Sequence, residues 1–153
     1  MEELKARDLM STEVITISPH ARIIEAAKKM LEHRVSGLPV VDDDGRLIGV
    51  MSEGDLLRRA EIGTDAATSG SLFSLELAHQ FLKAHGQHVE DVMTQKVASV
   101  LENTALAEIA SLMQLMRLKR LPVTNHGKVI GVVSRADILR VLVNGAERSR
   151  GYQ

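Results

Sequence analysis

Residues 131–139 read GVVSRADIL, an apolar strand-like run that stops at a serine and continues, with an acid three residues later, into an amphipathic run. A serine just before a helix caps its free backbone N–H groups, and an acid in the first turn suits the helix dipole. Ser134 and Asp137 therefore form either a helix cap or a polar corner that holds a ligand. Residues 49–57 repeat the pattern as GVMSEGDLL, so the chain supplies its own comparison.

The similarity extends through the chain. A shift of 83 positions aligns the first half with the second, and the shift becomes 82 after the turn DDDG, which is matched by the shorter NHG. Register kept through a whole unit, with its one deletion in a turn, indicates an internal duplication. The identical pairs are Asp8/Asp91, Met10/Met93, Val14/Val97, Glu25/Glu108, Ala27/Ala110, Met30/Met113, Arg34/Arg117, Leu38/Leu121, Pro39/Pro122, Val40/Val123, Gly45/Gly127, Ile48/Ile130, Gly49/Gly131, Val50/Val132, Ser52/Ser134, Asp55/Asp137, Leu57/Leu139 and Arg58/Arg140.

Each copy predicts the order β-α-β-β-α, which makes the fold class α/β. The last two strands flank a polar glycine turn, as in a hairpin. The expected strands are 14–17, 38–41 and 47–51 in the first copy, and 97–100, 121–124 and 129–133 in the second.

Two helices complete each copy. In the first copy Ser18 is the expected N-cap of the first helix and Pro19 its first helical residue. The last helix is expected to begin at the serine of the repeated motif. The apolar stripe of the first helix is Ile23, Ala26, Ala27, Met30 and Leu31, matched by Leu106, Ile109, Ala110, Met113 and Met116.

These elements give a division of the chain into four parts. Residues 1–60 form the first repeat and residues 89–145 the second. Between them, residues 61–88 are a linker that begins as a loop and holds a helix in its second half. Residues 146–153 are expected to be a flexible tail.

Composition excludes several classes of protein. The 153 residues carry a net charge of −1 and only 2% aromatics, which argues against nucleic acid or an anionic membrane as a partner. There is no cysteine, so disulfides and thiolate sites are excluded and a reducing compartment fits. With no signal peptide and no apolar run of roughly 20 residues, we expect a soluble, cytoplasmic protein.

Two longer segments carry a family resemblance. SGLPVVDDDGRLIGVMSEGDLL (residues 36–57) and KRLPVTNHGKVIGVVSRADIL (residues 119–139) resemble the cystathionine-β-synthase (CBS) domain. Two copies in tandem resemble a Bateman module. The resemblance implies two repeats packed with pseudo-two-fold symmetry around two shared clefts, which bind adenosine-containing ligands and serve as energy or metabolite sensors.

The repeated corner suits a sugar. Ser52 and Ser134 lie where a strand meets a helix N-terminus, and one carboxylate can accept two hydrogen bonds from vicinal hydroxyls. The resemblance assigns ribose binding to Asp55 and Asp137. The alternative is structural, because Ser-x-x-Asp is close to a capping box; the two roles can coexist.

A phosphate would need cations, since Asp137 would repel it. Only the second copy offers them, and the alternative is a solvated basic edge. The candidates are Lys119, Arg120 and Arg135, where the first copy has Ser36, Gly37 and Glu53.

The resemblance also implies an apolar slot for the base, beside the first strand and the Leu-Pro-Val strand. The alternative is that these valines are simply strand core. The candidate residues are Val14, Thr16, Val40, Val97, Ser99 and Val123.

Other chemistries lack support in the sequence. His79, His85 and His88 do not share a helical face or a set of partner ligands, so no metal is expected. No dinucleotide fingerprint, P-loop or nucleophile elbow occurs, so no catalytic residue is assigned.

The sequence thus predicts a non-catalytic sensor that binds AMP, ADP or ATP and changes repeat orientation or oligomer contacts. Leftover apolar helix faces predict a homodimer, and an unidentified protein would be regulated. An NAD- or S-adenosylmethionine-binding sensor and a structural scaffold with unoccupied clefts remain alternatives.

Overall fold

The computed structural model describes residues 3–56 and 88–151, which divide into two compact units. We name each unit after the acid of its repeated motif. The Asp55 unit comprises residues 15–97, and the Asp137 unit comprises residues 1–14 together with residues 98–153.

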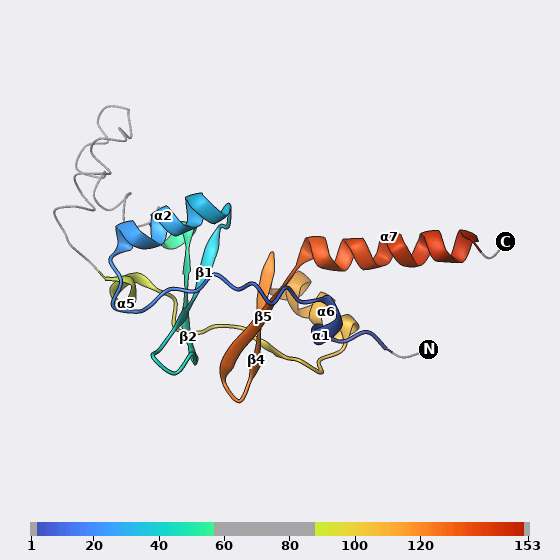
Figure 1. The fold of residues 1–153 in the computed structure, drawn as a ribbon, viewed down its shortest axis with the longest axis horizontal. Coiled ribbons are helices and arrows are strands. Elements are labelled where there is room, and N and C mark those ends of the chain that lie inside the picture. Colours follow the sequence, from blue (N-terminus) through green and yellow to red (C-terminus); the bar gives the residue numbers. More distant parts are fainter. Residues whose placement is uncertain (1–2, 57–87, 152–153) are drawn as a thin grey trace, which may run out of the picture. The chain divides into compact units, whose positions relative to one another are not determined.

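The Asp55 unit is built on a hairpin. Strands β1 (Gly37–Val41) and β2 (Leu47–Ser52) pair antiparallel, and Ile17 forms a parallel bridge to Val40 of β1. Helix α2 (Ile23–His33) packs its buried face against this hairpin (Figure 1). Residues 53–56 are helical, and the short helix α5 (Val89–Val92) completes the unit.

The Asp137 unit repeats this plan. Its three-stranded sheet has the order β3-β4-β5, with β3 (Val100–Leu101) parallel to β4 (Arg120–Asn125) and β5 (Lys128–Ser134) antiparallel to β4. Helix α6 (Leu106–Met116) follows β3 in the chain. Helix α1 (Ala6–Leu9) comes from the first repeat, and α7 (Arg135–Gly151) extends from the end of β5 (Figure 1).

Each core therefore takes a helix from the other repeat. Ala6 and Leu9 of the first repeat are buried in the Asp137 unit, whereas Val89 of the second repeat is buried in the Asp55 unit. The backbone follows the same exchange, because Ser11 pairs with Val132 and residue 94 pairs with Val50. The remaining core residues are Val100, Ile109, Met113, Leu121, Val123 and Val133 in the Asp137 unit, and Ile17, Ile23, Ala26, Met30, Leu38, Val40 and Met51 in the Asp55 unit.

The two hairpins and the helix that starts after Ser134 agree with the sequence prediction, but the predicted start of α2 is wrong. Its N-cap is Arg22, and Ser18 and Pro19 precede the helix. The Ser18 hydroxyl accepts a hydrogen bond from the His20 backbone N–H (3.1 Å), so this serine caps a local turn instead of the helix. Serine makes both kinds of cap, and its side chain alone does not distinguish them.

The structure also differs from the sequence prediction in the burial of the helix faces and in the length of α7. The expected apolar stripe is not fully buried, because Leu31 is 80% and Met116 51% exposed. Helix α7 continues to Gly151, well into the segment expected to be a tail. The expected linker helix lies outside the described residues. Within the described part of the chain, no helix is long and apolar enough to cross a membrane.

Candidate functional site

The corner at Ser134 joins the end of β5 to the start of α7. The Ser134 backbone N–H donates to Asp137 Oδ2 (2.8 Å), and the Asp137 backbone N–H donates back to Ser134 Oγ (3.2 Å). The remaining oxygen, Oδ1, lies 3.3 Å from Nη1 of Arg140 in an ion pair. The Asp137 side chain is 13% exposed and that of Arg140 is 71% exposed.

The Ser52 corner has the same reciprocal cap. The Ser52 backbone N–H donates to Asp55 Oδ2 (2.9 Å), and the Asp55 backbone N–H donates to Ser52 Oγ (3.2 Å). The Ser52 hydroxyl also donates to Oδ2 (2.9 Å), while the Thr94 hydroxyl donates to Oδ1 (3.2 Å). Asp55 is only 3% exposed.

Both motifs are therefore helix caps, and the capping interpretation is confirmed. A cap uses the backbone-facing edge of the carboxylate, so the outer oxygen decides whether a ligand can also bind. That oxygen meets an exposed arginine at Asp137 and a threonine hydroxyl at Asp55. The proposed ribose role of the four residues stays a prediction.

The backbone brings all three candidate cations to the Asp137 cap. Arg120 stands opposite Ser134 in the β4–β5 register, and the Arg135 backbone N–H donates to the Lys119 carbonyl (3.0 Å). Lys119 and Arg120 are exposed. The guanidinium of Arg135 is engaged elsewhere, because its Nε donates to the Leu118 carbonyl (3.1 Å).

The residues expected around a base fall into two groups. Val40 and Val123 are 0% exposed and belong to the two cores, as the alternative interpretation held. Their side chains offer a ligand no surface in this structure. Val14, Thr16 and Val97 are half-buried and Ser99 is exposed. In the Asp55 unit, Lys29 Nζ donates to the Thr16 carbonyl (2.8 Å).

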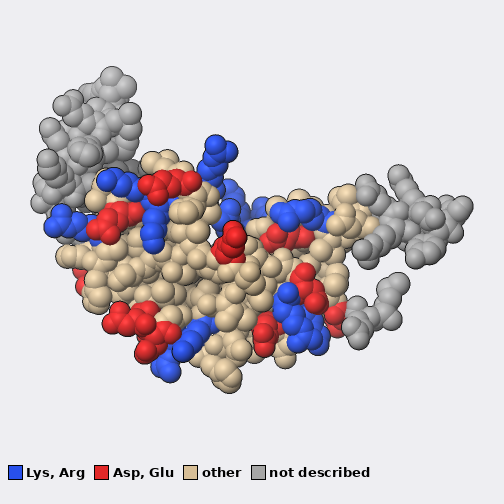
Figure 2. Space-filling model, viewed as in Figure 1, with Lys and Arg blue, Asp and Glu red and all other residues tan. Residues whose placement is uncertain are grey.

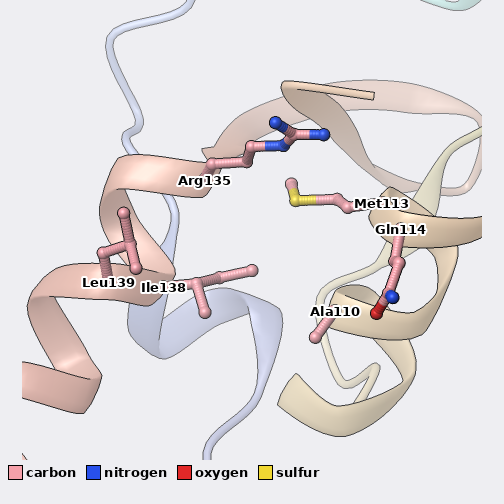
Figure 3. Close-up of a pocket in the computed structure, with 6 residues that line it drawn as sticks. All are labelled: Ala110, Met113, Gln114, Arg135, Ile138 and Leu139. Atoms are coloured by element: carbon pink, nitrogen blue, oxygen red, sulfur yellow. The ribbon is translucent and has the colours of Figure 1, made fainter. Parts of the chain in front are cut away.

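A pocket of about 310 Å³ lies in the Asp137 unit, between α6 and the first turns of α7. Figure 3 shows Ile138 directed toward α6, and the side chains of Arg135 and Met113 approaching each other from the two helices. Its walls are mostly apolar, and Ser134 and Asp137 are not among its lining residues. The pocket is lined by Ala110, Met113, Gln114, Arg135, Ile138 and Leu139.

No group of three or more His, Asp or Glu side chains that could hold a metal occurs within residues 3–56 and 88–151. His88 lies beside its own helix cap, with Nδ1 at 3.9 Å from Asp91 Oδ2. His79 and His85 lie outside the described residues. On the face shown in Figure 2, acidic and basic side chains are interspersed over the described residues.

Sequence reasoning did not identify two partners of the acids. Thr94 bonds Asp55 and Arg140 pairs with Asp137. The duplication held a signal for Thr94, because the 83-residue shift aligns it with Ser11, and both follow a repeated methionine. The alignment alone could not show that Thr94 contacts Asp55, because that contact requires the exchange of segments between the repeats, which the sequence does not reveal.

Comparison with known families decides the assignment. The family model of the CBS domain matches residues 6–61 and again residues 89–144. The chain belongs to the CBS domain family. It is a tandem CBS pair, and its α/β fold class, with two repeats of the Bateman-module type, is confirmed.

Curated relatives include the chloroplastic CBS domain-containing protein CBSX1 of Arabidopsis thaliana, which is 31% identical over 134 residues. That match covers 81% of this chain but 57% of the relative, so the chain spans under two thirds of its length. The uncharacterized protein YlbB of Bacillus subtilis is 31% identical over 88% of this chain and 79% of its own.

Solved structures give the same family. A crystal structure of CBSX2 in complex with AMP is 29% identical, with a TM-score of 0.73 over 92% of this chain and 96% of that chain. A second structure of CBSX2, from Arabidopsis thaliana, has a TM-score of 0.76 over 95% of this chain and 99% of that chain, again at 29% identity. The first of these two CBSX2 structures contains AMP.

Proposed function

We propose that this CBS pair is a non-catalytic regulatory module that binds AMP, ADP or ATP. The observation that carries the proposal is the structure of the related CBSX2 with AMP, together with the Ser-x-x-Asp corner in both units. No catalytic residue is assigned. A chain without cysteine suits a reducing compartment, and the cytoplasm remains our expectation.

The Asp137 unit supplies the groups that a nucleotide needs. Asp137 Oδ1 faces outward toward an exposed arginine, so it can exchange that partner for ribose hydroxyls. Lys119 and Arg120 lie at the same corner, on the exposed end of the hairpin, and would hold a phosphate. Arg135 is a weaker candidate because of its bond to Leu118.

For the base we retain the four residues that keep exposed surface, Val14, Thr16, Val97 and Ser99. We omit Val40 and Val123, since both are fully buried. Val14 and Ser99 belong to the Asp137 unit, and Thr16 and Val97 belong to the Asp55 unit, so each unit offers one valine that would contact an adenine ring without aromatic stacking.

Regulation would follow from differential affinity. A ligand shifts a conformational equilibrium only as far as it prefers one state over the other. We propose that nucleotide binding favours one relative orientation of the repeats, or one set of contacts between copies, and that another protein reads this change.

We further propose that the module is a homodimer formed through α6 and α7. Leu115 and Met116 are 80% and 51% exposed on α6, and Leu139 is 60% exposed on α7. Leu139 also lines the apolar pocket between the same two helices, whereas Leu115 and Met116 are not among its lining residues, so α6 and α7 offer exposed apolar side chains as well as a recess. In a two-fold interface each copy would place its projecting groups against the recess of the other.

Calorimetric titration with AMP, ADP, ATP and adenosine tests the ligand. Asp137→Ala should weaken binding of AMP and adenosine by roughly tenfold or more, because it removes a charged hydrogen-bond acceptor. Asp43→Ala removes the same charge from the exposed turn of the other hairpin and should have no effect. Lys119→Ala with Arg120→Ala should weaken AMP and leave adenosine unchanged.

The same panel includes NAD and S-adenosylmethionine. S-adenosylmethionine carries no phosphate, so its affinity should not depend on Lys119 and Arg120. If the chain binds it tightly, and the double variant Lys119→Ala with Arg120→Ala binds it equally well, S-adenosylmethionine would be the favoured ligand. A chain that binds none of these compounds would be a structural scaffold, and the sensor proposal would be wrong.

Light scattering at micromolar concentration tests the dimer. Leu115→Glu should shift the protein to monomer, because it places a charge in the apolar interface. Leu101→Glu, at a 56% exposed side chain on β3, should leave the dimer intact. A wild-type protein that is monomeric under these conditions would contradict the proposal.

A further inference from the structure

The two ribose-binding candidates look alike in sequence but differ in their contacts. In both units the serine backbone N–H donates to Oδ2 of the acid, at 2.9 Å for Asp55 and 2.8 Å for Asp137. The cap is therefore common to both units. The difference lies at the outer oxygen, Oδ1, which is the atom that a ligand would approach.

At Asp55 this oxygen receives a hydroxyl whose position is fixed. The backbone N–H of Thr94 donates to the Val50 carbonyl (2.9 Å), and the Val50 N–H donates to the Thr94 carbonyl (2.9 Å). Thr94 is thus held against β2 on both sides, and the branched threonine side chain has few χ1 rotamers. Its hydroxyl reaches Asp55 Oδ1 at 3.2 Å, so a ribose would have to displace it.

Asp55 is also more deeply enclosed. The residue is 3% exposed, and the Ser52 hydroxyl donates a further hydrogen bond to Oδ2. A carboxylate whose oxygens already accept hydrogen bonds from neighbouring residues gains little from a diol, because each new bond replaces an existing one.

Asp137 presents the opposite case. Its Oδ1 faces Arg140, whose side chain is 71% exposed, and an ion pair with such a solvated group contributes little stability. Ser11 occupies the position that corresponds to Thr94, with the same backbone pairing to Val132. Within the described part of the chain, the Ser11 hydroxyl makes no hydrogen bond to Asp137.

The charges near the two caps reinforce this difference. Glu53 of the Asp55 unit corresponds to Arg135 of the Asp137 unit, and the backbone holds both residues in the same way. The Glu53 N–H donates to the Ser36 carbonyl (2.9 Å), and the Arg135 N–H donates to the Lys119 carbonyl (3.0 Å). An acid beside the Asp55 cap disfavours a phosphate, whereas Lys119 beside the Asp137 cap favours one.

We propose that Thr94 keeps the Asp55 cap closed to ligands, so that each chain binds one nucleotide, at the Asp137 unit. This inference rests on the proposed nucleotide-binding function. Thr94 would then determine whether the Asp55 site binds a nucleotide. The Asp55 carboxylate would only cap its helix, whereas the Asp137 carboxylate would cap its helix and also bind the ribose.

Calorimetry on the full chain with adenosine and AMP tests the inference. Adenosine carries no phosphate, so it reports on the diol without interference from Glu53. Wild type should bind one equivalent of either compound, and Asp137→Ala should weaken that binding by about tenfold or more. Thr94→Val keeps the shape of the side chain and removes the hydroxyl, and it should create a second, weaker adenosine site.

Ser11→Ala is the matched control, because it removes the hydroxyl at the corresponding position of the other unit. It should leave the stoichiometry at one. Two equivalent sites in wild type, or a Thr94→Val variant that still binds a single adenosine, would overturn the inference and leave the proposed function intact. Absence of any binding to wild type would overturn both.

Discussion

At the scale of single residues, two glycines allow the exchanged segments to pair with the hairpins. A Cβ on Gly131 would lie 2.5 Å from Met10 Sδ and 3.0 Å from the Ser11 carbonyl oxygen. A Cβ on Gly49 would meet Met93 and residue 94 in the same way. The glycine of the repeated motif is therefore required by a close backbone approach, not by its dihedral angles.

We expect Gly131→Ala to lower the free energy of unfolding by roughly 1–3 kcal/mol, because the Met10 side chain can move but the Ser11 backbone cannot. Urea denaturation followed by circular dichroism measures the change. Gly145→Ala is the control, since nothing lies within 4 Å of its Cβ position on α7. That variant should be as stable as wild type or more stable, by up to about 1 kcal/mol, because alanine favours a helix.

At the scale of elements, α2 and α6 end in the same uncommon way. Their C-caps, Arg34 and Arg117, both have φ of 53°, in the left-handed region that favours glycine. In each helix the cap N–H donates to a carbonyl of the last turn, such as that of Leu31 or Gln114 (3.4 Å each). Because arginine has a Cβ, this conformation costs each helix free energy that a glycine would not.

Arg117→Gly should raise the free energy of unfolding by roughly 0.5–1 kcal/mol, the relief of the left-handed conformation less the added entropy of the unfolded chain. Lys28→Gly, at an exposed position inside α2, should instead lower it by about 1 kcal/mol. Thermal unfolding of both variants distinguishes the two effects. Equal destabilisation by both would show that the left-handed cap carries no strain.

At the scale of the whole molecule, the sequence repeats and the structural units do not coincide. Leu9 belongs to the first repeat but is 8% exposed in the core of the Asp137 unit, beside Val100 and Leu121. A repeat cut from the chain would therefore lose part of its own core and retain a helix that belongs to the other unit.

Leu9→Ala should destabilise the Asp137 unit by roughly 2–4 kcal/mol, because it leaves a cavity in that core. Amide hydrogen exchange locates the effect. Residues 98–146 should exchange faster, and residues 15–56 should keep their wild-type protection. Faster exchange confined to residues 15–56 would contradict the helix exchange.

Local signals account for the parts of the fold that the sequence predicted. The hairpins follow from apolar runs around glycine turns, and His126 and Gly127 both adopt the positive φ that such a tight turn needs. The caps at Ser52 and Ser134 follow from hydrogen bonds within four consecutive residues. The predicted start of α2 is wrong because a serine can cap either a helix or a turn, and the Ser18 hydroxyl accepts its hydrogen bond within a turn.

The sequence by itself determined that the chain is duplicated, that a helix and then a hairpin follow one another in each copy, and that a serine and an acid follow each hairpin. These features depend on neighbouring residues, so a repeated sequence repeats them. The first strand of the predicted order β-α-β-β-α is only a bridge at Ile17 in the first copy and the short strand Val100–Leu101 in the second. Only the tertiary structure decided which helix completes which core and which residue meets the outer oxygen of each acid. Ala6 and Val89 occupy corresponding positions in the two copies, and both are small or branched apolar residues, so the local sequence does not assign either one to a particular hairpin. Long-range packing assigns the segment that contains Val89 and Thr94 to the Asp55 unit, and as a result the Thr94 hydroxyl donates to Asp55 Oδ1.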